Sequence, residues 1–317
     1  MEDRQKILTD EAKSLLEQGK VSWVIGYEPG SLKFTTTPLI TRDMDELDRL
    51  VINPFIVNNL GNFLIELEGR VAIVAKGCDS RSIVSLIQDN KLVRDNVVIL
   101  GVPCTGVIDL AKVGRLVGRE RDEIDEIDDI ALRDDKVMVT IAGKKEEFPT
   151  SEVLFDNCLS CELPTPQEYD ILLGQPVKPS PSDAPDKLKE IPVEARWQFW
   201  EKEFSRCIRC YACRNICPAC FCRRCFVEET EPQWLLPIPH WQDNLLFQVA
   251  RNIHVAGRCT DCGECERACP VDILLRSLTR EMYDIVADLF QYKAGMDKEA
   301  APLLTAYEVE EAEDLIR

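Results

Sequence analysis

Regularly spaced cysteines carry the clearest chemical signal in this sequence. The chain has 15 cysteines among 317 residues, and eight of them form two runs with one shared pattern. In each run, three cysteines at intervals of three residues are followed by a fourth cysteine and a proline: Cys207, Cys210, Cys213 and Cys217 before Pro218, and Cys259, Cys262, Cys265 and Cys269 before Pro270. Three closely spaced thiolates can wrap one face of an iron–sulfur cube. The pattern therefore predicts two [4Fe–4S] clusters in the C-terminal part of the chain.

In tandem motifs of this kind, which bacterial ferredoxins use, the fourth cysteine of each run binds the cluster of the other run. We therefore expect cluster 1 to be held by Cys207, Cys210, Cys213 and Cys269, and cluster 2 by Cys259, Cys262, Cys265 and Cys217. Two zinc sites are the alternative, although tetrahedral zinc seldom takes three ligands from one tight loop. Paired cubanes exchange single electrons, so this part of the chain is predicted to be an electron relay.

Basic residues gather around the first run. Between residues 206 and 225 there are five arginines and no acidic residue, in a chain whose formal net charge is −18. Two interpretations stay open. The cations raise the reduction potentials of the anionic clusters, or they form a solvent-facing patch that docks an acidic partner.

Seven cysteines lie outside the two runs. Three follow the first run at once and either bind a further metal or are buried thiols: Cys220, Cys222 and Cys225. Four lie in the N-terminal part, two of them just beyond predicted parallel strands, where α/β folds place their sites, and two at ligand spacing: Cys78, Cys104, Cys158 and Cys161. These four are predicted to hold a third [4Fe–4S] cluster, and unrelated core cysteines are the alternative.

The elements that must position the N-terminal cysteines form an α/β pattern. Two apolar strands, Val71–Ala75 and Val97–Val102, flank a helix over residues 83–88, which predicts a βαβ unit and a partly parallel sheet. Apolar periodicity and capping residues predict further strands over 21–27, 137–141 and 148–155, and helices over 4–18, 43–51 and 58–67. We expect Cys158 and Cys161 to lie in a loop.

Proline content divides the chain. Residues 174–193 contain five prolines among polar residues and are predicted to be a linker. It separates an N-terminal α/β domain over 1–173 from a mostly helical two-cluster domain over 194–280. A helix and an acidic tail are expected over 281–317, where the tail is either a docking element or a solvated end.

Composition excludes several classes of partner. A strongly acidic chain repels phosphate backbones and anionic lipid surfaces, so nucleic acid and membrane surfaces are disfavoured. No apolar run approaches the length of a membrane helix, and residues 1–6 lack the apolar core of a signal peptide. We therefore expect a cytoplasmic protein without membrane insertion, whose cysteines bind metal rather than form disulfides.

Two short segments, added to the tandem cysteine runs, resemble a known family. With Gly101-Val102-Pro103-Cys104 and Cys158-Leu159-Ser160-Cys161, the chain is similar to the beta subunits of coenzyme F420-reducing hydrogenase and F420-dependent formate dehydrogenase. The segment from Lys76 to Arg81 fits members found beside heterodisulfide reductase-like proteins. The resemblance implies an FAD-containing subunit that passes electrons between a soluble carrier (F420, NAD(P)H or ferredoxin) and the catalytic component of a hydrogenase, formate dehydrogenase or heterodisulfide reductase-like complex.

The flavin implied by this resemblance has one candidate anion site. After the strand Val71–Ala75 the chain turns into a helix, and the residues that would receive a flavin phosphate there are Lys76, Gly77, Asp79, Ser80 and Arg81. An ordinary capped turn is the alternative. No glycine fingerprint of a dinucleotide-binding fold follows a strand.

Two functions are therefore expected to compete. The first is an oxidoreductase subunit in which FAD converts two-electron chemistry into single-electron steps. The second is a flavin-free electron wire with clusters and no reaction of its own. No residue pattern identifies a catalytic side chain.

Overall fold

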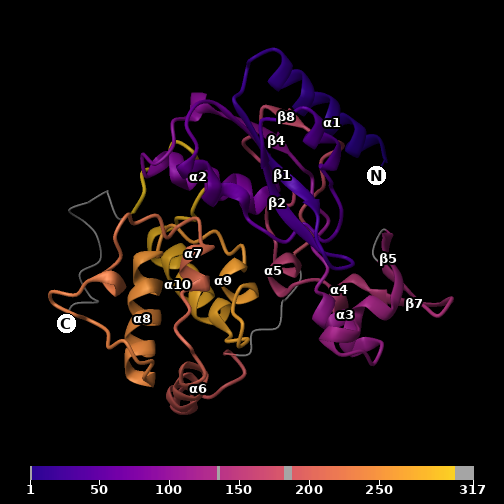
Figure 1. Cartoon of the computed structure of the whole chain (residues 1–317). Helices are drawn as coiled ribbons and strands as arrows, with labels where there is room; N and C mark the ends of the chain where they lie inside the picture. Colours follow the sequence, from indigo (N-terminus) through magenta and orange to yellow (C-terminus); the bar gives the residue numbers. More distant parts are fainter. Residues whose placement is uncertain (1, 134–135, 182–187, 304–317) are drawn as a thin grey trace. The chain divides into compact units, whose positions relative to one another are not determined.

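The computed structural model describes residues 2–133, 136–181 and 188–303 (Figure 1). The chain forms two compact units. The first comprises residues 1–80 and 94–185, and the second comprises residues 81–93 and 186–317. Helix α2 (Gly77–Gln88) thus begins in the first unit and ends in the second.

The first unit contains a five-stranded sheet. Its strand order is β2-β1-β3-β4-β8. Strands β1 (Trp23–Pro29), β3 (Val71–Ala75), β4 (Val97–Gly101) and β8 (Ile171–Leu172) run parallel, and β2 (Thr36–Thr41) is an antiparallel edge strand. All residues of β3 and β4 are buried, as expected for parallel strands covered on both faces. The predicted parallel pairing is confirmed, with Val71 opposite Val97.

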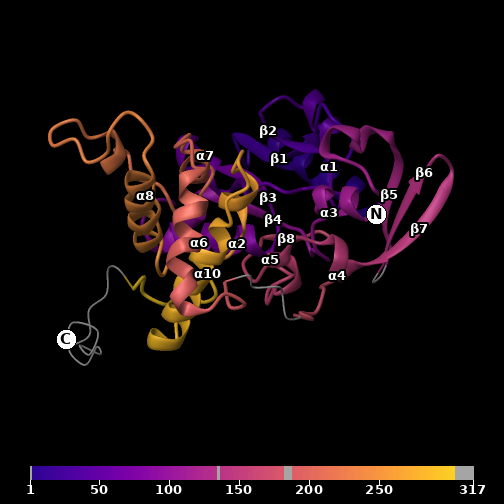
Figure 2. The ribbon, with the colours of Figure 1, turned by 90° about the horizontal axis from the view of Figure 1, so that it is seen from below.

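A smaller antiparallel sheet completes the first unit. It consists of β5 (Ile127–Arg133), β6 (Lys136–Ile141) and β7 (Lys144–Pro149), and Figure 2 shows the hairpin of β6 and β7. The apolar core beneath it includes Val137 and Val139 from β6 and Val113 from α3 (Leu110–Leu116).

The strand predicted over residues 148–155 is wrong. Strand β7 ends at Pro149, and residues 150–153 form the short helix α4. The strand stops at this residue because proline has no N–H to continue the ladder. The first four residues of the strand, Lys144–Glu147, are charged and carry no apolar signal. Cys158 belongs to another short helix, α5 (Asp156–Leu159), rather than to a loop.

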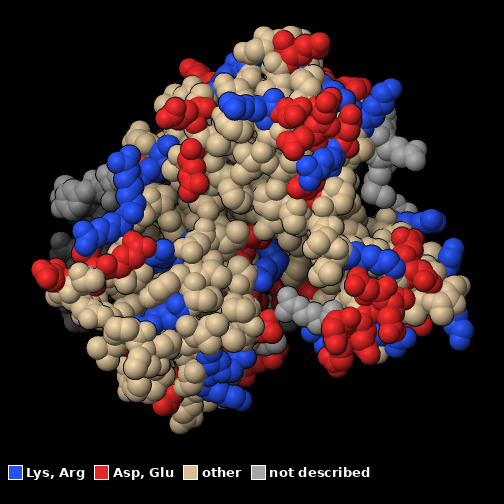
Figure 3. Space-filling model, in the orientation of Figure 1, with Lys and Arg blue, Asp and Glu red and all other residues tan. Residues whose placement is uncertain are grey.

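The acidic stretch before β6 is a solvated face. Segment η4 (Arg121–Glu126) leads into β5, and every third residue from Ile124 to Ile130 is buried. The acidic residues between them are all exposed: Asp122, Glu123, Asp125, Glu126, Asp128 and Asp129. Figure 3 shows this concentration of acidic side chains where α3 and β5 lie.

The remaining helices of the first unit are one α-helix and several 3₁₀ segments. Helix α1 (Glu2–Glu17) matches the predicted N-terminal helix. The helices predicted over 43–51 and 58–67 are shorter 3₁₀ segments, η1 (Asp45–Arg49) and η2 (Leu60–Glu66). A further 3₁₀ turn, η3 (Arg94–Asn96), precedes β4.

The second unit is helical. Its described residues form three long helices, α6 (Val193–Ser205), α8 (Trp241–His254) and α10 (Leu275–Phe290), and two short ones, α7 (Ala212–Asn215) and α9 (Glu264–Arg267) (Figures 1 and 2). Helix α8 contacts α6 and α10, α10 contacts α9, and the two short helices contact each other. A 3₁₀ turn, η5 (Phe226–Glu228), lies between α7 and α8. Buried cysteines belong to the apolar core here, since Cys213, Cys265 and Cys269 pack with Phe204 and Phe247.

The predicted fold class is therefore confirmed: an α/β part with a partly parallel sheet precedes a helical part. Between Leu172 and Val193 the described residues form no helix or strand, and residues 182–187 of the predicted linker lie outside the described residues. The acidic tail from residue 304 onward also lies outside them. No helix in the described ranges is long and apolar enough to cross a membrane.

Candidate metal centres

The two cysteine runs follow the same backbone path. In the first run Arg209 and Tyr211 have left-handed conformations, with φ values of 54° and 61°. At the equivalent positions of the second run, Asp261 and Gly263 have φ values of 54° and 77°. A left-handed non-glycine residue costs about 1–2 kcal/mol, and such strain concentrates at functional sites. The repeated conformation therefore indicates that both loops are shaped for the same ligand.

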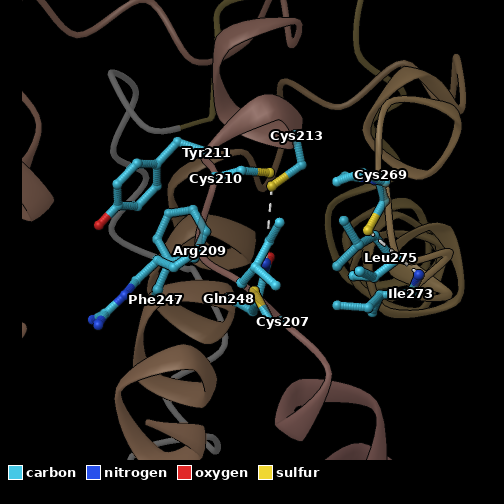
Figure 4. A pocket seen from close by; sticks show the side chains of 13 residues that line it. Cys207, Arg209, Cys210, Tyr211, Cys213, Phe247, Gln248, Cys269, Ile273 and Leu275 are labelled. Carbon is cyan, nitrogen blue, oxygen red and sulfur yellow. Dashed lines mark hydrogen bonds between the residues drawn. The ribbon is translucent and has the colours of Figure 1, made fainter. Parts of the chain in front are cut away.

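Four cysteines surround one small pocket in the second unit. The pocket has a volume of about 20 Å³ and is lined by Cys207, Cys210, Cys213 and Cys269, with Phe247 and Ile273 among its apolar walls. Figure 4 shows three of these cysteines coming from the first run and Cys269 from the second. The set is the one that the motif predicts for cluster 1.

Nitrogen donors point at the sulfur atoms of this pocket. The backbone nitrogen of Ile273 donates to Cys269 Sγ at 3.4 Å, and the Gln248 side-chain amide donates to Cys213 Sγ at 3.8 Å (Figure 4). Hydrogen bonds to ligating sulfurs stabilise the anionic state of an iron–sulfur cluster. The donors therefore fit thiolates that carry iron.

The second set of four also lies together. Burial raises the pKa of the Cys262 thiol to about 12, with contributions from Glu264 and Cys217. Burial and the nearby Cys217 thiol also raise the pKa of Cys265, while Arg251 lowers it. The pKa of the Cys259 thiol is raised by burial, by Asp261, and by the thiols of Cys262 and Cys265. Cys217 thus lies near Cys262 and Cys265 of the second run, as the exchange of fourth ligands between runs requires.

Chemistry of the donor set supports a cubane at each position. Cys213, Cys265 and Cys269 are buried in an apolar core, where an unligated thiolate would be unfavourable and iron would hold the sulfur deprotonated. The ligands of a cubane bind different corners of a cube and need not converge on one atom. In the described ranges, no three histidine, cysteine, aspartate or glutamate side chains are gathered around a single ion site.

Cys220 lies directly against the second set. Its thiol forms a hydrogen bond with that of Cys217, which lowers the pKa of Cys220 and raises that of Cys217. Cys222 is exposed, and Cys225 begins the turn η5 as its N-cap. The three extra cysteines are therefore not equivalent, and the Cys220 thiol bonds a predicted ligand, Cys217.

Most of the arginines around the first run are paired with carboxylates. The closest nitrogen–oxygen distances are 2.7 Å for Arg206–Glu203, 3.7 Å for Arg209–Asp243, 2.8 Å for Arg214–Glu228 and 2.8 Å for Arg224–Glu229. These partners neutralise much of the positive charge that the sequence places there. The loop arginines are consequently weak candidates for tuning a cluster.

The N-terminal cysteines form a partial set in the first unit. Burial and the nearby Cys158 and Cys161 thiols raise the pKa of Cys104 to about 12. Backbone nitrogens donate to two of these sulfurs, from Gly106 to Cys104 and from Val107 to Cys158, each at 3.4 Å. These three cysteines could therefore supply three of the four ligands of a cluster, with backbone donors to two of their sulfurs.

Cys78 is oriented differently. Its thiol donates to Asp79 Oδ1 at 3.6 Å, beside the buried Lys76. Lys76 lies near Cys104 as well, because it lowers the pKa of that thiol. Lys76 thus lies near both Cys78 and Cys104. A fourth ligand from Cys78 would require its thiol to turn away from Asp79.

The candidate phosphate turn is occupied by protein groups. Lys76 forms an ion pair with Asp79 at 2.9 Å and donates to the Asn58 carbonyl at 2.9 Å. Asp79 also accepts a hydrogen bond from the Lys76 backbone nitrogen at 2.9 Å. A Cβ on Gly77 would lie 1.7 Å from the carbonyl oxygen of Leu163, so the glycine accommodates a neighbouring backbone.

The other two residues of this turn are also engaged. Ser80 donates to the Glu168 carbonyl at 2.9 Å, and Arg81 donates to the carbonyls of Ala294 and Thr260 at 2.9 and 3.2 Å. Both side chains are buried. The turn in this arrangement does not fit a flavin phosphate, and a capped turn describes it better.

Helix α8 contributes polar residues that no motif singles out. Asn244, Gln248 and Arg251 are buried on one face, and their spacing is that of a helix. Asn244 donates to the carbonyls of Phe204 and Cys207 at 2.9 and 2.8 Å. These residues could have been found in the long segment between Cys217 and Cys259, because polar residues at helical spacing predict a helix face directed at a polar ligand.

Two family models match parts of this chain. Residues 68–189 match the family described as the C terminus of the beta subunit of coenzyme F420 hydrogenase/dehydrogenase, and residues 203–273 match the "4Fe-4S dicluster domain". The second match supports two [4Fe–4S] clusters in the helical unit.

Relatives match along nearly the whole chain. The F420-dependent formate dehydrogenase subunit beta of Methanocaldococcus jannaschii is 25% identical over 92% of this chain and 92% of its own length. The F420-dependent formate dehydrogenase 1 subunit beta of Methanococcus maripaludis is 23% identical over 92% and 91%. A solved chain of the F420-reducing [NiFe] hydrogenase complex from Methanosarcina barkeri is 16% identical, with a TM-score of 0.36, and the match covers 48% of this chain and 57% of that one.

Proposed function

We propose that this chain is the electron-transfer subunit of an F420-linked oxidoreductase. The support is its distant homology to F420-dependent formate dehydrogenase beta subunits and its matches to the C terminus of such beta subunits and to a 4Fe-4S dicluster domain. Its partner in this proposal is a catalytic subunit of the formate dehydrogenase or hydrogenase type. A heterodisulfide reductase-like partner stays a prediction.

The observation that carries the proposal is the four-cysteine pocket. Residues distant in sequence, Cys213 and Cys269, line it together with Cys207 and Cys210. This supports the exchange of fourth ligands between the two runs, which brings two clusters close enough for single-electron transfer.

In such a relay the protein controls the surroundings of the clusters, namely their access to solvent and the hydrogen bonds to their sulfur ligands. Apolar residues such as Phe204 and Phe247 exclude water around the cysteines, and Ile273 and Gln248 donate hydrogen bonds to sulfur. Exclusion of solvent and donors to sulfur are the means by which a protein adjusts a cluster potential. Cys210 is exposed, so the edge of the pocket that it forms is where an electron partner can approach.

A third cluster in the first unit is part of the proposal. Cys104, Cys158 and Cys161 would hold it, with Cys78 as the fourth ligand after a change of side-chain rotamer. FAD is proposed from the family resemblance. Its phosphate would bind somewhere other than the turn at residues 76–81, since the side chains of that turn are engaged with protein groups.

Iron counting tests the cluster assignments. The anaerobically reconstituted chain should contain about twelve irons if all three clusters form and about eight if only the tandem pair does. Cys210→Ser should remove about four irons, because it deletes one ligand of cluster 1. Cys222→Ser is the matched control, since this exposed cysteine belongs to neither set, and its iron content should equal that of the unmodified chain. Equal iron in both variants would contradict the ligand assignment.

Flavin and carrier require separate measurements. Acid release should yield about one FAD per chain, and the loaded protein should reduce or oxidise F420 in preference to NAD(P)H and ferredoxin. Absence of flavin after FAD is added back, with the clusters intact, would favour the flavin-free electron wire.

A further inference from the structure

A buried guanidinium lies close to both cysteine sets of the helical unit. Arg251, on helix α8, has a relative exposure of only 4%. Its Nη2 donates to the carbonyl oxygen of Cys213 at 3.1 Å, which ties it to the first set. The thiols that act on it electrostatically come from both sets: Cys265 and Cys217 from the second and Cys213 from the first, together with Cys220.

The surroundings of Arg251 are unusual for a buried cation. Burial by itself would lower the pKa of the guanidinium, but the cysteines raise it well above its ordinary value. Within the described residues it forms no ion pair with a carboxylate, in contrast to Arg206, Arg209, Arg214 and Arg224. Its Nε has no hydrogen-bond partner there either. A buried, unpaired charge is costly unless an anion compensates it.

From this arrangement we propose that Arg251 is the shared cation that sets the reduction potentials of both clusters. This inference rests on the proposed function, because it requires the two clusters. A four-thiolate cubane is anionic, and it gains a further negative charge when it is reduced. A fixed positive charge beside both sets therefore stabilises the reduced states and raises both potentials.

Helix α8 holds the guanidinium in place. Gln248, one turn earlier, donates to Cys213 Sγ at 3.8 Å, and Asn244 donates to the carbonyls of Phe204 and Cys207. The helix is thus fastened to the first cysteine loop along its length. The residues between the two cysteine runs therefore supply a polar helix face, in addition to connecting the runs.

The test is a redox titration of the full, reconstituted chain, monitored by electron paramagnetic resonance. Arg251→Gln removes the charge and should lower the midpoint potentials of both clusters. A tenfold loss in the equilibrium for reduction corresponds to about 59 mV for a one-electron couple. Arg251→Lys keeps the charge and should restore most of the potential. Arg224→Gln removes the same charge from a side chain that is 67% exposed and paired with Glu229, and should leave both potentials unchanged.

Iron content separates the possible failures. If the unmodified chain lacks the two clusters, the proposed function itself fails. If Arg251→Gln retains iron and unmodified potentials, Arg251 has only a structural role and the inference is overturned. If Arg251→Gln loses iron, Arg251→Lys decides: retained iron with near-normal potentials supports the charge-based role, whereas loss of iron in the lysine variant as well overturns it.

Discussion

The buried ion pair at the start of α2 permits a quantitative test of the first unit. Lys76 and Asp79 are 3% and 0% exposed, and the Nζ–Oδ2 distance is 2.9 Å. Asp79 also accepts a hydrogen bond from the Tyr27 hydroxyl at 3.2 Å. Asp79→Asn keeps the shape but leaves a buried ammonium without a counter-charge. Removing one partner of a buried pair costs about 3–5 kcal/mol of unfolding free energy.

This cost translates into a measurable thermal shift. At about 2–4 °C per kcal/mol for a domain of this size, the midpoint should fall by about 6–20 °C. The assay is far-UV circular dichroism of the reconstituted chain under anaerobic conditions. Hydrogen exchange at the β3 amides then reports on the first unit alone, because a chain with two units need not unfold in one step.

Two further variants make the test specific. Asp48→Asn breaks the exposed pair between Lys13 and Asp48, in which the aspartate is 67% exposed, and should cost no more than about 1 kcal/mol. Lys76→Met combined with Asp79→Asn removes both charges and should cost less than the sum of the single changes, with a coupling of about 1–3 kcal/mol. Equal shifts for Asp79→Asn and Asp48→Asn would refute the reasoning that burial makes this pair important.

Other consequences follow from individual contacts. Gly77→Ala should lower the unfolding free energy of the first unit by about 3 kcal/mol in a urea titration, because the new Cβ would lie 1.7 Å from the Leu163 carbonyl oxygen and the backbone there can move little. Gly118→Ala is the control, since this glycine has a φ of 65° and open space around it, and it should cost about 1 kcal/mol in the same titration. Arg258→Ala should lower the unfolding free energy of the second unit by about 3 kcal/mol, because it leaves the Asp89 carboxylate, 3% exposed, without the guanidinium that binds both its oxygens at 2.9 and 3.0 Å. Unchanged amide hydrogen-exchange rates in α8 would contradict this. Cys158→Ser should lower iron by about four per chain if the third cluster forms, and unchanged iron would leave these residues as core cysteines.

The sequence by itself determined the chemistry of the helical unit. Cysteine spacing is local, and a loop of seven residues with three thiolates can accommodate few ligands other than a cubane. The same locality explains why the strands β3 and β4 were predictable, since five consecutive buried residues leave an apolar run in the sequence. Strand β7 was not predictable in this way, because its first four residues, Lys144–Glu147, are charged and exposed and its place is set by pairing with β6.

Tertiary structure decided what surrounds these residues. From the sequence, the turn at residues 76–81 resembles an anion site because Lys76, Ser80 and Arg81 lie within six residues of one another, yet each side chain bonds a partner distant in sequence. Conversely, Arg251 lies outside every motif and becomes notable only when α8 places it against cysteines of both runs. The spacing of residues along the chain determines which ligands a loop can offer. The electric field at those ligands depends on charged groups that only folding brings near, because Coulomb interactions depend on distance in space.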